Sequence, residues 1–361
     1  MELIVISTPI GFLGSGKGGG VELTLNSLVS GLLELGHKVK VIAPEKSKLS
    51  ESCKRAELFC VGGEEQESWQ HIEYHSRISI PKNSIVSNLV EKAFILGKNC
   101  DAVINLSYDW LPISRTINSD IPIMHLISMG DESYQINHLI SKVYSLCPDN
   151  FAFHTNIQAA DYPFISNPTI IGNGFELSEY NFKNKLNGPL AWVGRVAPEK
   201  GLEDAVNVAY DLGEKLNVWG FLQNKNYAKK IEKSFPADLI NWKGFVPTSQ
   251  LQDELGKCRA LINTPKWNEA YGNVVVEAMA CGVPVVAYKR GGPGEIIQHG
   301  KTGFLVEPDN KAELVSSLRK INTIKRSNCR KWVEKNASTK IFAKKVVKWI
   351  KKVISQNKTN F

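Results

Sequence analysis

The stretch LIVISTPIGFLGSGKGGGVELTLNSLVSGLLELGHKVKVIA, residues 3–43, predicts the opening of a parallel α/β domain. Residues 3–8 form an apolar, β-branched run that is typical of a buried strand. A glycine-rich turn follows, and residues 21–35 then place apolar side chains at helical spacing. Gly36 suits the end of that helix, and residues 37–43 are expected to form the next strand. Strand, helix and strand in this order predict a βαβ unit.

The same alternation continues along the chain and predicts an α/β protein with two Rossmann-like, doubly wound domains facing across a cleft. A stretch rich in Asn, Gly and Pro around residues 167–190 predicts the linker. We therefore expect an N-terminal domain at 1–172 and a C-terminal domain at 173–340, followed by a basic amphipathic helix and tail at 341–361. Further strands are expected at 101–106, 121–126, 190–194, 216–220, 240–245, 260–264, 284–287 and 303–306.

Composition limits the class of protein. Hydrophobic residues make up 43% and charged residues 22% of the chain, which is typical of a globular protein. No apolar run is long enough to cross a bilayer, and residues 1–10 lack a basic signal-peptide start, so we expect a cytoplasmic protein. The net charge of +8 owes much to the lysines of the tail, and we expect no nucleic-acid partner. We predict that residues 341–354 form a docked helix, with membrane contact as the alternative.

The glycine-rich turn predicts a place where backbone can approach a ligand closely. Gly18, Gly19 and Gly20 precede a helix, so N–H groups and the helix dipole can meet a phosphate or a sugar. Gly14, Gly16 and Gly19 also fit GxGxxG, with Glu45 as the acidic residue after the second strand. A nicotinamide-dependent oxidoreductase is therefore a rival interpretation.

A basic pair follows the first strand of the second domain. Arg195 and Lys200 lie just beyond the carboxyl end of residues 190–194, the sheet edge where ligands of such domains bind. A guanidinium fork and an ammonium group can together neutralise a departing diphosphate without a metal. The alternative is an exposed pair with Glu199 as the ionic partner.

Two glutamates eight positions apart form a second candidate group. Glu269 is expected in a loop and Glu277 inside the helix at residues 273–280, where carboxylates can accept hydrogen bonds from sugar and ribose hydroxyls. The backbone of Gly272, Asn273 and Val274 opens that helix and can meet phosphate. The alternative is a capping acid with a solvated helical glutamate. His71 and His75 have no further ligands nearby, so we expect no metal site.

The order of these motifs resembles the retaining glycosyltransferase family 4, whose architecture is called GT-B. The matching stretches are Val193–Gly201, 242–245, 269–277, Met279–Val286, Gly291–Gly292, Gly303–Val306, Gly18–Gly20 and Ile171–Gly174. The resemblance implies that Arg195 and Lys200 clamp the donor diphosphate and Glu277 binds ribose. It also implies that Glu269 orients the sugar, while Gly18, Gly19, Gly20 and Val246 contact the donor. No metal or cofactor is then expected.

One part of the resemblance is incomplete. The family usually places a histidine of the N-terminal domain against the sugar, and here the segments 107–110 and 125–128 occupy those neighbourhoods. Asp109 becomes a catalytic candidate on this basis. His125 is a possible substitute for the histidine, with a core histidine as the alternative.

Residues 7–24, 108–112 and 125–130 are similar to a narrower group, the UDP-glucose:tetrahydrobiopterin α-glucosyltransferases. This similarity implies UDP-glucose as donor and a small acceptor, a reduced pterin, with Tyr108, Trp110, His125, Ser128 and Met129 as acceptor contacts. The residues themselves leave glucose and galactose open as the donor sugar. The alternatives are a lipid or polysaccharide acceptor, the oxidoreductase named above, and a sugar-nucleotide sensor without catalysis.

Overall fold

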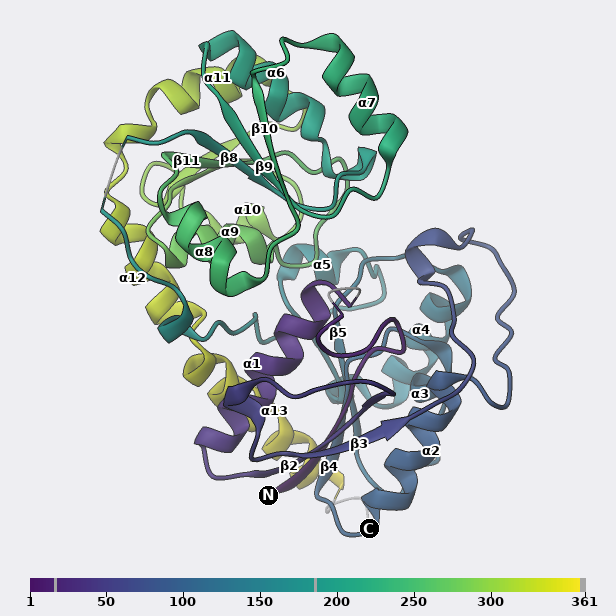
Figure 1. Ribbon diagram of the computed structural model, residues 1–361. Helices are drawn as coiled ribbons and strands as arrows, with labels where there is room; N and C mark the ends of the chain where they lie inside the picture. The colour runs from purple at the N-terminus through teal and green to yellow at the C-terminus, as the bar shows by residue number, and fades with distance from the viewer. Residues whose placement is uncertain (16–17, 185–186, 358–361) are drawn as a thin grey trace. The chain divides into compact units, whose positions relative to one another are not determined.

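The computed structural model describes residues 1–15, 18–184 and 187–357 of the 361-residue chain. The chain forms two compact units, one of Met1–Phe175 with Thr339–Phe361 and one of Glu176–Ser338. Each unit is built on a parallel sheet with helices on both faces (Figure 1). The predicted α/β class with two doubly wound domains is confirmed.

The sheet of the first unit has the order β3-β2-β1-β4-β5-β6-β7, and every neighbouring pair is parallel. The order reverses between β1 and β4, and at such a switch point the loops that follow the strands diverge and leave a crevice. The strands are β1 Glu2–Ile6, β2 Lys38–Pro44, β3 Glu57–Val61, β4 Ala102–Asn105, β5 Ile123–Ile127, β6 Phe151–Phe153 and β7 Thr169–Ile170.

Apolar side chains cover both faces of this sheet. Consecutive residues of a strand point to opposite faces, and in the buried central strands both sets are apolar. In β1, Leu3 and Val5 join the core that includes Leu25 of α1, whereas Ile4 and Ile6 join the core that includes Leu89 of α2. The helices are α1 Gly20–Glu34, α2 Ile85–Gly97, α3 Trp110–Ser114, α4 Tyr134–Leu146 and α5 Asn156–Ala160, with short 3-10 turns at Glu51–Cys53, Trp69–His71 and Pro148–Asn150.

The second unit repeats the plan with the order β10-β9-β8-β11-β12-β13, again parallel throughout. Its strands are β8 Leu190–Val193, β9 Leu216–Trp219, β10 Ile240–Gly244, β11 Ala260–Asn263, β12 Val285–Tyr288 and β13 Gly303–Val306. Its helices are α6 Leu202–Leu212, α7 Lys225–Ser234, α8 Thr248–Gly256, α9 Asn273–Ala280, α10 Pro293–Ile296, α11 Lys311–Arg319 and α12 Arg326–Asn336, with 3-10 turns at Leu177–Glu179, Pro198–Lys200 and Ile321–Thr323. The switch point lies between β8 and β11.

The boundary between the units falls between Phe175 and Glu176, whereas the sequence suggested 172/173. The intervening residues are held on α1 by hydrogen bonds. The Asn173 side chain donates to Thr24 Oγ1 over 2.9 Å, and Ser27 Oγ donates to the Gly174 carbonyl over 2.6 Å. These contacts keep the segment with the first unit.

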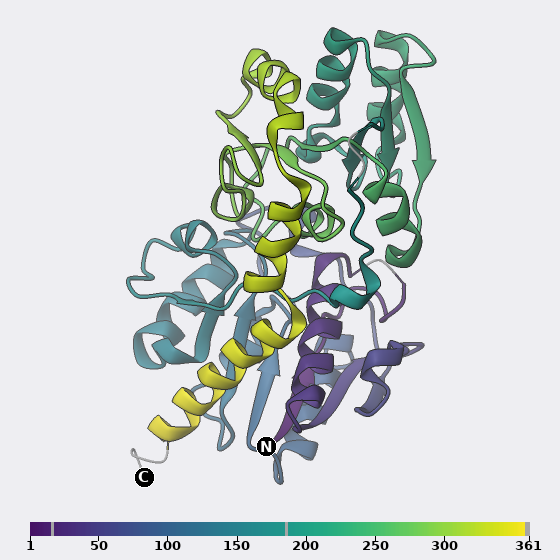
Figure 2. The same ribbon diagram turned by 90° about the vertical axis from the view of Figure 1, so that its left-hand side faces the viewer.

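The chain returns to the first unit through α13, Thr339–Asn357, which packs beside α1 (Figure 2). Phe342, Val346, Trp349, Ile350 and Val353 are buried in the core that α1 shares, and the lysines between them are exposed. The approach is close, since a Cβ on Gly31 of α1 would lie 2.6 Å from the Ala343 Cβ. The apolar stripe of the predicted tail helix is thus buried in the first unit. No helix among the described residues is both long and apolar enough to cross a bilayer.

Replacing Phe342 by alanine should destabilise the first unit by about 3–5 kcal/mol, because a fully buried ring would leave a cavity. The ring packs against Gly174, whose Cβ would lie 2.7 Å from Phe342 Cδ1. Chemical denaturation followed by circular dichroism would measure the change. The matched variant Lys348→Ala, on the exposed face of the same helix, should change stability by no more than about 0.5 kcal/mol. A loss below about 1 kcal/mol for Phe342→Ala would mean that α13 is not docked as described.

Candidate active site

The loops after β8 and β11 are joined at the carboxyl edge of the second sheet. Gly201 has a φ of 63°, and a Cβ there would lie 2.0 Å from the Thr264 carbonyl oxygen. Thr264 Oγ1 donates to the Gly201 carbonyl over 2.8 Å, and the Lys266 amide donates to the Glu199 carbonyl over 2.8 Å. Because β8 and β11 are neighbours, these bonds bring the loop that contains Lys200 beside the loop that leads to Glu269.

Lys200 and Glu269 meet directly. Lys200 Nζ lies 2.5 Å from Glu269 Oε1, and their side chains are only 18% and 11% exposed. The ammonium group also lies 4.8 Å from the centre of the Trp267 ring, within the range of a cation–π contact. The ion pair is therefore shielded from water, and its charges interact more strongly than an exposed pair would. The sequence placed both residues at the site, but it did not predict their contact.

Two glycines let a neighbouring loop pack against Glu269. Gly291 has a φ of 63°, and a Cβ at this position would lie 2.4 Å from the Glu269 amide nitrogen. The Gly292 amide donates to the Glu269 carbonyl over 2.7 Å. The backbone that carries the Glu269 carboxylate is thus held from two sides, by the loops that follow β8 and β12.

Gly272 forms the N-cap of α9 with a φ of 93°, in the left-handed region that favours glycine. The Val275 amide donates to its carbonyl over 3.0 Å, so the helix begins at Asn273. Asn273 and Val274 are partly exposed at this helix start, where amide groups and the helix dipole favour an anion. The structure thus places these three predicted donor contacts at one helix N-terminus.

Glu277 lies just over one turn inside α9 and is 7% exposed. Burial raises the pKa of its carboxyl group to about 7, and the Tyr180 hydroxyl donates to Oε1 over 3.3 Å. The solvated helical glutamate that the sequence allowed as an alternative is not what the structure shows.

Arg195 remains near the same edge but has other partners. Its guanidinium donates to Gln223 Oε1 over 2.6 Å and lies 3.5 Å from Glu199 Oε1, with the side chain 33% exposed. The Glu199 contact is the ionic partner that the sequence allowed. Val246 is partly exposed after β10.

A second ionic network at this edge was not predicted. Asp204, whose side chain is 3% exposed, accepts from Lys266 and from the Tyr288 hydroxyl, the latter over 2.7 Å. Asp309 lies 2.7 Å from Lys266 Nζ and 3.0 Å from the Arg290 guanidinium. These bonds tie the loops after β11, β12 and β13 to the start of α6. No short motif contains these residues, because they come from four separate segments of the chain, around positions 204, 266, 288–290 and 309.

In the first unit the glycine-rich turn leads into α1 as predicted. Gly19 is the N-cap with a φ of 54°, Gly20 begins the helix, and Gly18 is partly exposed. Glu22 of the first turn accepts from the Gly14 amide. Gly16, on which the dinucleotide-binding interpretation depends, lies outside the described residues.

The structure does not support a catalytic role for Asp109. Its side chain is buried, and both carboxylate oxygens are bonded within the unit. Oδ1 accepts from the Leu111 amide over 3.2 Å, and Oδ2 accepts from Gln66 over 2.7 Å and from Trp69 over 3.2 Å. Asp109 is the N-cap of α3 and anchors the loop that contains Gln66 and Trp69.

His125 is a core histidine and not an acceptor contact. It is fully buried in β5, and its ring nitrogens lie 3.0 Å from Asn105 Nδ2 and 2.7 Å from Thr116 Oγ1. Burial lowers its pKa to about 3, so the ring is neutral.

Ser128, which directly follows β5, contacts a histidine that the sequence did not point to. Ser128 Oγ lies 2.9 Å from His154 Nε2.

The remaining acceptor candidates are largely packed into the unit. Tyr108 is 8% exposed in a core cluster, against which Trp110 and Met129 pack.

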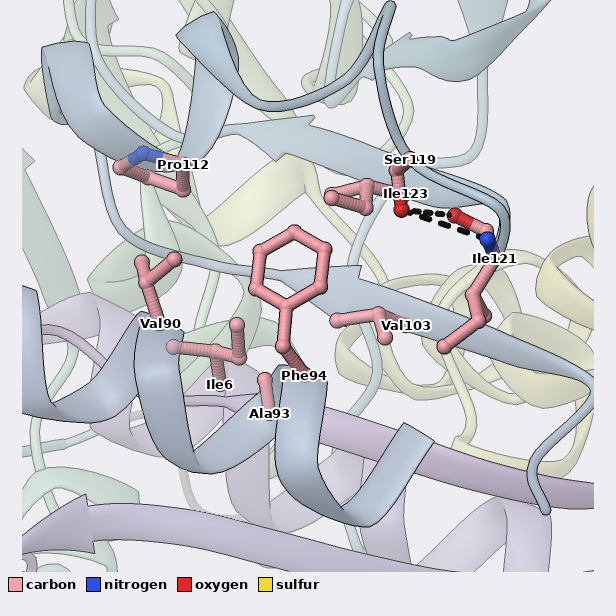
Figure 3. A pocket seen from close by; sticks show the side chains of 9 residues that line it. All are labelled: Ile6, Val90, Ala93, Phe94, Val103, Pro112, Ser119, Ile121 and Ile123. Atoms are coloured by element: carbon pink, nitrogen blue, oxygen red, sulfur yellow. Dashed lines mark hydrogen bonds between the residues drawn. The ribbon is translucent and has the colours of Figure 1, made fainter. Parts of the chain in front are cut away.

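An apolar pocket between α2 and the sheet surrounds Phe94 (Figure 3), with a volume of about 10 Å³, close to the minimum for one water molecule. That pocket is too small for a substrate.

Comparison with known proteins gives these features a context. Residues 179–339 match the family model described as glycosyl transferases group 1, which covers the second unit. Sucrose synthase of Solanum tuberosum is 29% identical over 142 residues, 37% of this chain. The match spans only 17% of that enzyme's length.

Solved structures extend the likeness to both units. Sucrose-phosphate synthase from Thermosynechococcus elongatus matches with a TM-score of 0.79 and 15% identity, over 99% of this chain and 100% of that one. The chain has the GT-B fold. A second GT-B match is Anabaena HepE in complex with UDP-glucose, with a TM-score of 0.74 and 16% identity over 98% of this chain and 100% of that one. The GT-B likeness thus extends over nearly the whole chain, whereas the family model matches residues 179–339.

Glu277→Gln should raise the free energy of unfolding at pH 8 by an amount on the order of 3 kcal/mol, because burying the charged carboxylate opposes folding. The carboxyl group is protonated in both states below its ordinary pKa of 4.5, so the difference should vanish there. As the pH rises from 4.5 through about 7, the unfolded chain releases the proton first and the wild type loses stability relative to the variant.

Denaturant titrations of both proteins between pH 5 and pH 8 would measure this difference. The exposed Glu232→Gln on α7 is the matched control and should show no such trend. Parallel stability curves for wild type and Glu277→Gln across this range would contradict the buried, proton-holding carboxyl group.

Proposed function

We propose that the protein is a glycosyltransferase that transfers glucose from UDP-glucose to a small acceptor, with retention of anomeric configuration and without a metal. The observation that carries the proposal is the shielded contact between Lys200 Nζ and Glu269 Oε1 at 2.5 Å. It lies at the carboxyl edge of a parallel sheet, within the residues that match the glycosyltransferase family. A cation for phosphate and a carboxylate for sugar hydroxyls are thereby side by side.

The donor diphosphate would take over the cationic groups. Lys200 would exchange Glu269 for a phosphate oxygen, and the half-buried Arg195 would meet the diphosphate from the same edge. Both would stabilise the negative charge that grows on the leaving UDP as its bond to the sugar breaks. The partly exposed amides at the start of α9 would add fixed dipoles with the same sign.

The two glutamates would then hold the sugar and the ribose. Released from Lys200, the Glu269 carboxylate would accept hydrogen bonds from glucose hydroxyls and orient the reacting carbon. Glu277 would accept from the ribose hydroxyls, which offset the cost of its buried charge. The acceptor oxygen would attack from the side of the departing diphosphate, and its proton would pass to the leaving phosphate oxygen.

We propose a reduced pterin, tetrahydrobiopterin, as the acceptor, because of the sequence similarity at residues 7–24, 108–112 and 125–130. A small acceptor is also favoured over a membrane lipid by the burial of the α13 apolar stripe.

The oxidoreductase interpretation leaves Lys200, Glu269 and the buried Glu277 without a role, and residues 179–339 match the family model described as glycosyl transferases group 1.

An activity screen tests this proposal. UDP-glucose and UDP-galactose would be incubated with tetrahydrobiopterin, flavonoids, lipids and oligosaccharides, each with and without EDTA. We expect α-glucosylation of the pterin that EDTA does not reduce, measured by mass spectrometry and by the anomeric coupling constant. A β-linked product, loss of activity in EDTA, or transfer only to lipid or glycan would each overturn the corresponding part of the proposal.

The double variant Arg195→Ala, Lys200→Ala should lower the turnover number by roughly 10²–10³ or more, because preorganised charge opposite the leaving group is removed. Steady-state kinetics with the acceptor found in the screen would measure it. Lys229→Ala with Lys230→Ala removes the same charge from exposed positions on α7 and should leave turnover within about twofold. Equal turnover in the two double variants would rule out the diphosphate clamp.

A further inference from the structure

A group of buried polar atoms without hydrogen bonds lies near the carboxyl edge of the first sheet. Buried polar groups in folded proteins nearly always have partners, so an exception needs an explanation. Among the described residues, the hydroxyls of Tyr108 and Ser133 and the Asn137 Oδ1 atom lack one. Their residues are 8%, 1% and 8% exposed. Tyr108 follows β4 closely, and the other two stand at the start of α4, after β5.

Several contacts bring these residues together. The Asn137 amide donates to the Ser133 carbonyl over 2.9 Å, and the Asn137 side chain faces the Tyr74 hydroxyl. That hydroxyl donates to Asp131 Oδ2 over 2.8 Å. The Tyr108 hydroxyl lies near the backbone of Glu132 and near the Tyr162 hydroxyl, which itself donates to the carbonyls of Met129 and Gly130. The unsatisfied atoms therefore surround the loop that contains Asp131 and Glu132.

Glu132 adds an uncompensated carboxylate to this place. Within the described residues, its side chain makes no hydrogen bond or ion pair, although it is only partly exposed. Burial, and the negative charges of Asp131 and Asp161, raise its pKa. A carboxylate in this setting costs free energy that an N–H donor would offset.

Aromatic rings form an exposed rim next to the carboxylates. Tyr74 and Tyr134 are 38% and 46% exposed, with ring centres 6.4 Å apart. His75 lies 5.4 Å from Tyr134, and His138 lies 6.1 Å from it with nearly parallel planes. The Tyr134 amide donates to the Tyr74 carbonyl over 3.0 Å, which joins the two segments. Exposed, flat rings of this kind offer stacking surfaces to a planar ligand.

We propose that Tyr74, Tyr108, Glu132, Ser133 and Tyr134 form the acceptor site, which binds a planar nitrogen heterocycle with a ring N–H next to an amino group. Two adjacent N–H donors match the two oxygens of the Glu132 carboxylate, as in other bidentate pairs. The Tyr108 and Ser133 hydroxyls would meet a ring carbonyl or nitrogen. Tyr134 would stack on the ring, and Tyr74, whose plane is inclined by 67° to that of Tyr134, would contact the ligand's edge. A sugar has paired hydroxyl donors but no flat aromatic ring, and an acyl chain has no donors. This inference rests on the proposed function for the assignment of the ligand as acceptor.

The site differs from the one that the sequence suggested. Of the five predicted acceptor contacts only Tyr108 belongs to it, while His125 is bonded within the core. Glu132, Ser133 and Tyr134 follow directly after residues 125–130, which carry the sequence similarity. The tertiary structure adds Tyr74 from a distant segment.

Anaerobic titration of the full chain, without donor, tests the site directly. The probes are tetrahydrobiopterin and the fragment 2-amino-4-hydroxypyrimidine, which has the paired donors, with caffeine as a planar nitrogen heterocycle that has no N–H donor. We expect Glu132→Gln to weaken binding of both paired-donor probes by roughly tenfold or more, and Tyr108→Phe to weaken it by several-fold. The exposed Glu91→Gln on α2 is the matched control and should bind within about twofold of wild type. UDP affinity, measured in parallel, should be unchanged in every variant and shows that each one is folded.

Two results would overturn the inference. Equal binding of both probes by wild type, Glu132→Gln and Tyr108→Phe would remove these residues from the site. Binding of neither probe by wild type would mean that the unsatisfied atoms hold only water. A wild type that binds the fragment through Glu132 but transfers glucose to no reduced pterin would instead refute the proposed acceptor and leave the heterocycle site standing.

Discussion

The contact between the Lys200 ammonium and the Glu269 carboxylate is the interaction on which the chemistry proposed for the second unit depends. The two atoms lie 2.5 Å apart and are largely shielded from water. Each charge compensates the other, whereas either one left unpaired in this place would cost folding free energy. In the proposed reaction, a phosphate of the donor would replace Glu269 as the partner of Lys200. Hydroxyl groups of the sugar would replace Lys200 as the partner of Glu269. Before the donor binds, the pair therefore has no net charge, and each of its groups already has a partner.

The pair can form only because backbone segments approach closely around it. Gly201 touches the Thr264 carbonyl, and Gly291 touches the Glu269 amide, both at distances that a Cβ would not allow. Both glycines also have positive φ values, so a side chain would be strained as well as crowded. Asp204 and Asp309 then tie the surrounding loops together by ionic bonds. The glycines and the ionic network thus perform one task, which is to hold the edge rigid.

The first unit distributes its polar groups differently. Asp109, which the sequence suggested as a catalytic residue, and His125, suggested as an acceptor contact or a core histidine, are both bonded within the unit. Buried atoms without a hydrogen bond belong instead to Tyr108, Ser133 and Asn137, among others, and they lie close to Glu132 and to a rim of exposed aromatic rings. A polar residue in the right sequence neighbourhood can serve the scaffold, and its hydrogen bonds decide which role it has.

The sequence by itself determined the two parallel sheets, because buried strands and amphipathic helices have periodicities that are local in the chain. It also determined the donor candidates around Lys200, Glu269 and Glu277, since short motifs place them directly after strands or at a helix start. Only the tertiary structure decided that α13 packs on α1, that Asp204 and Asp309 together join four segments, and that Tyr74 reaches Asp131. These contacts join residues far apart in the chain, and their partners are set by strand order and loop packing, which local patterns do not encode.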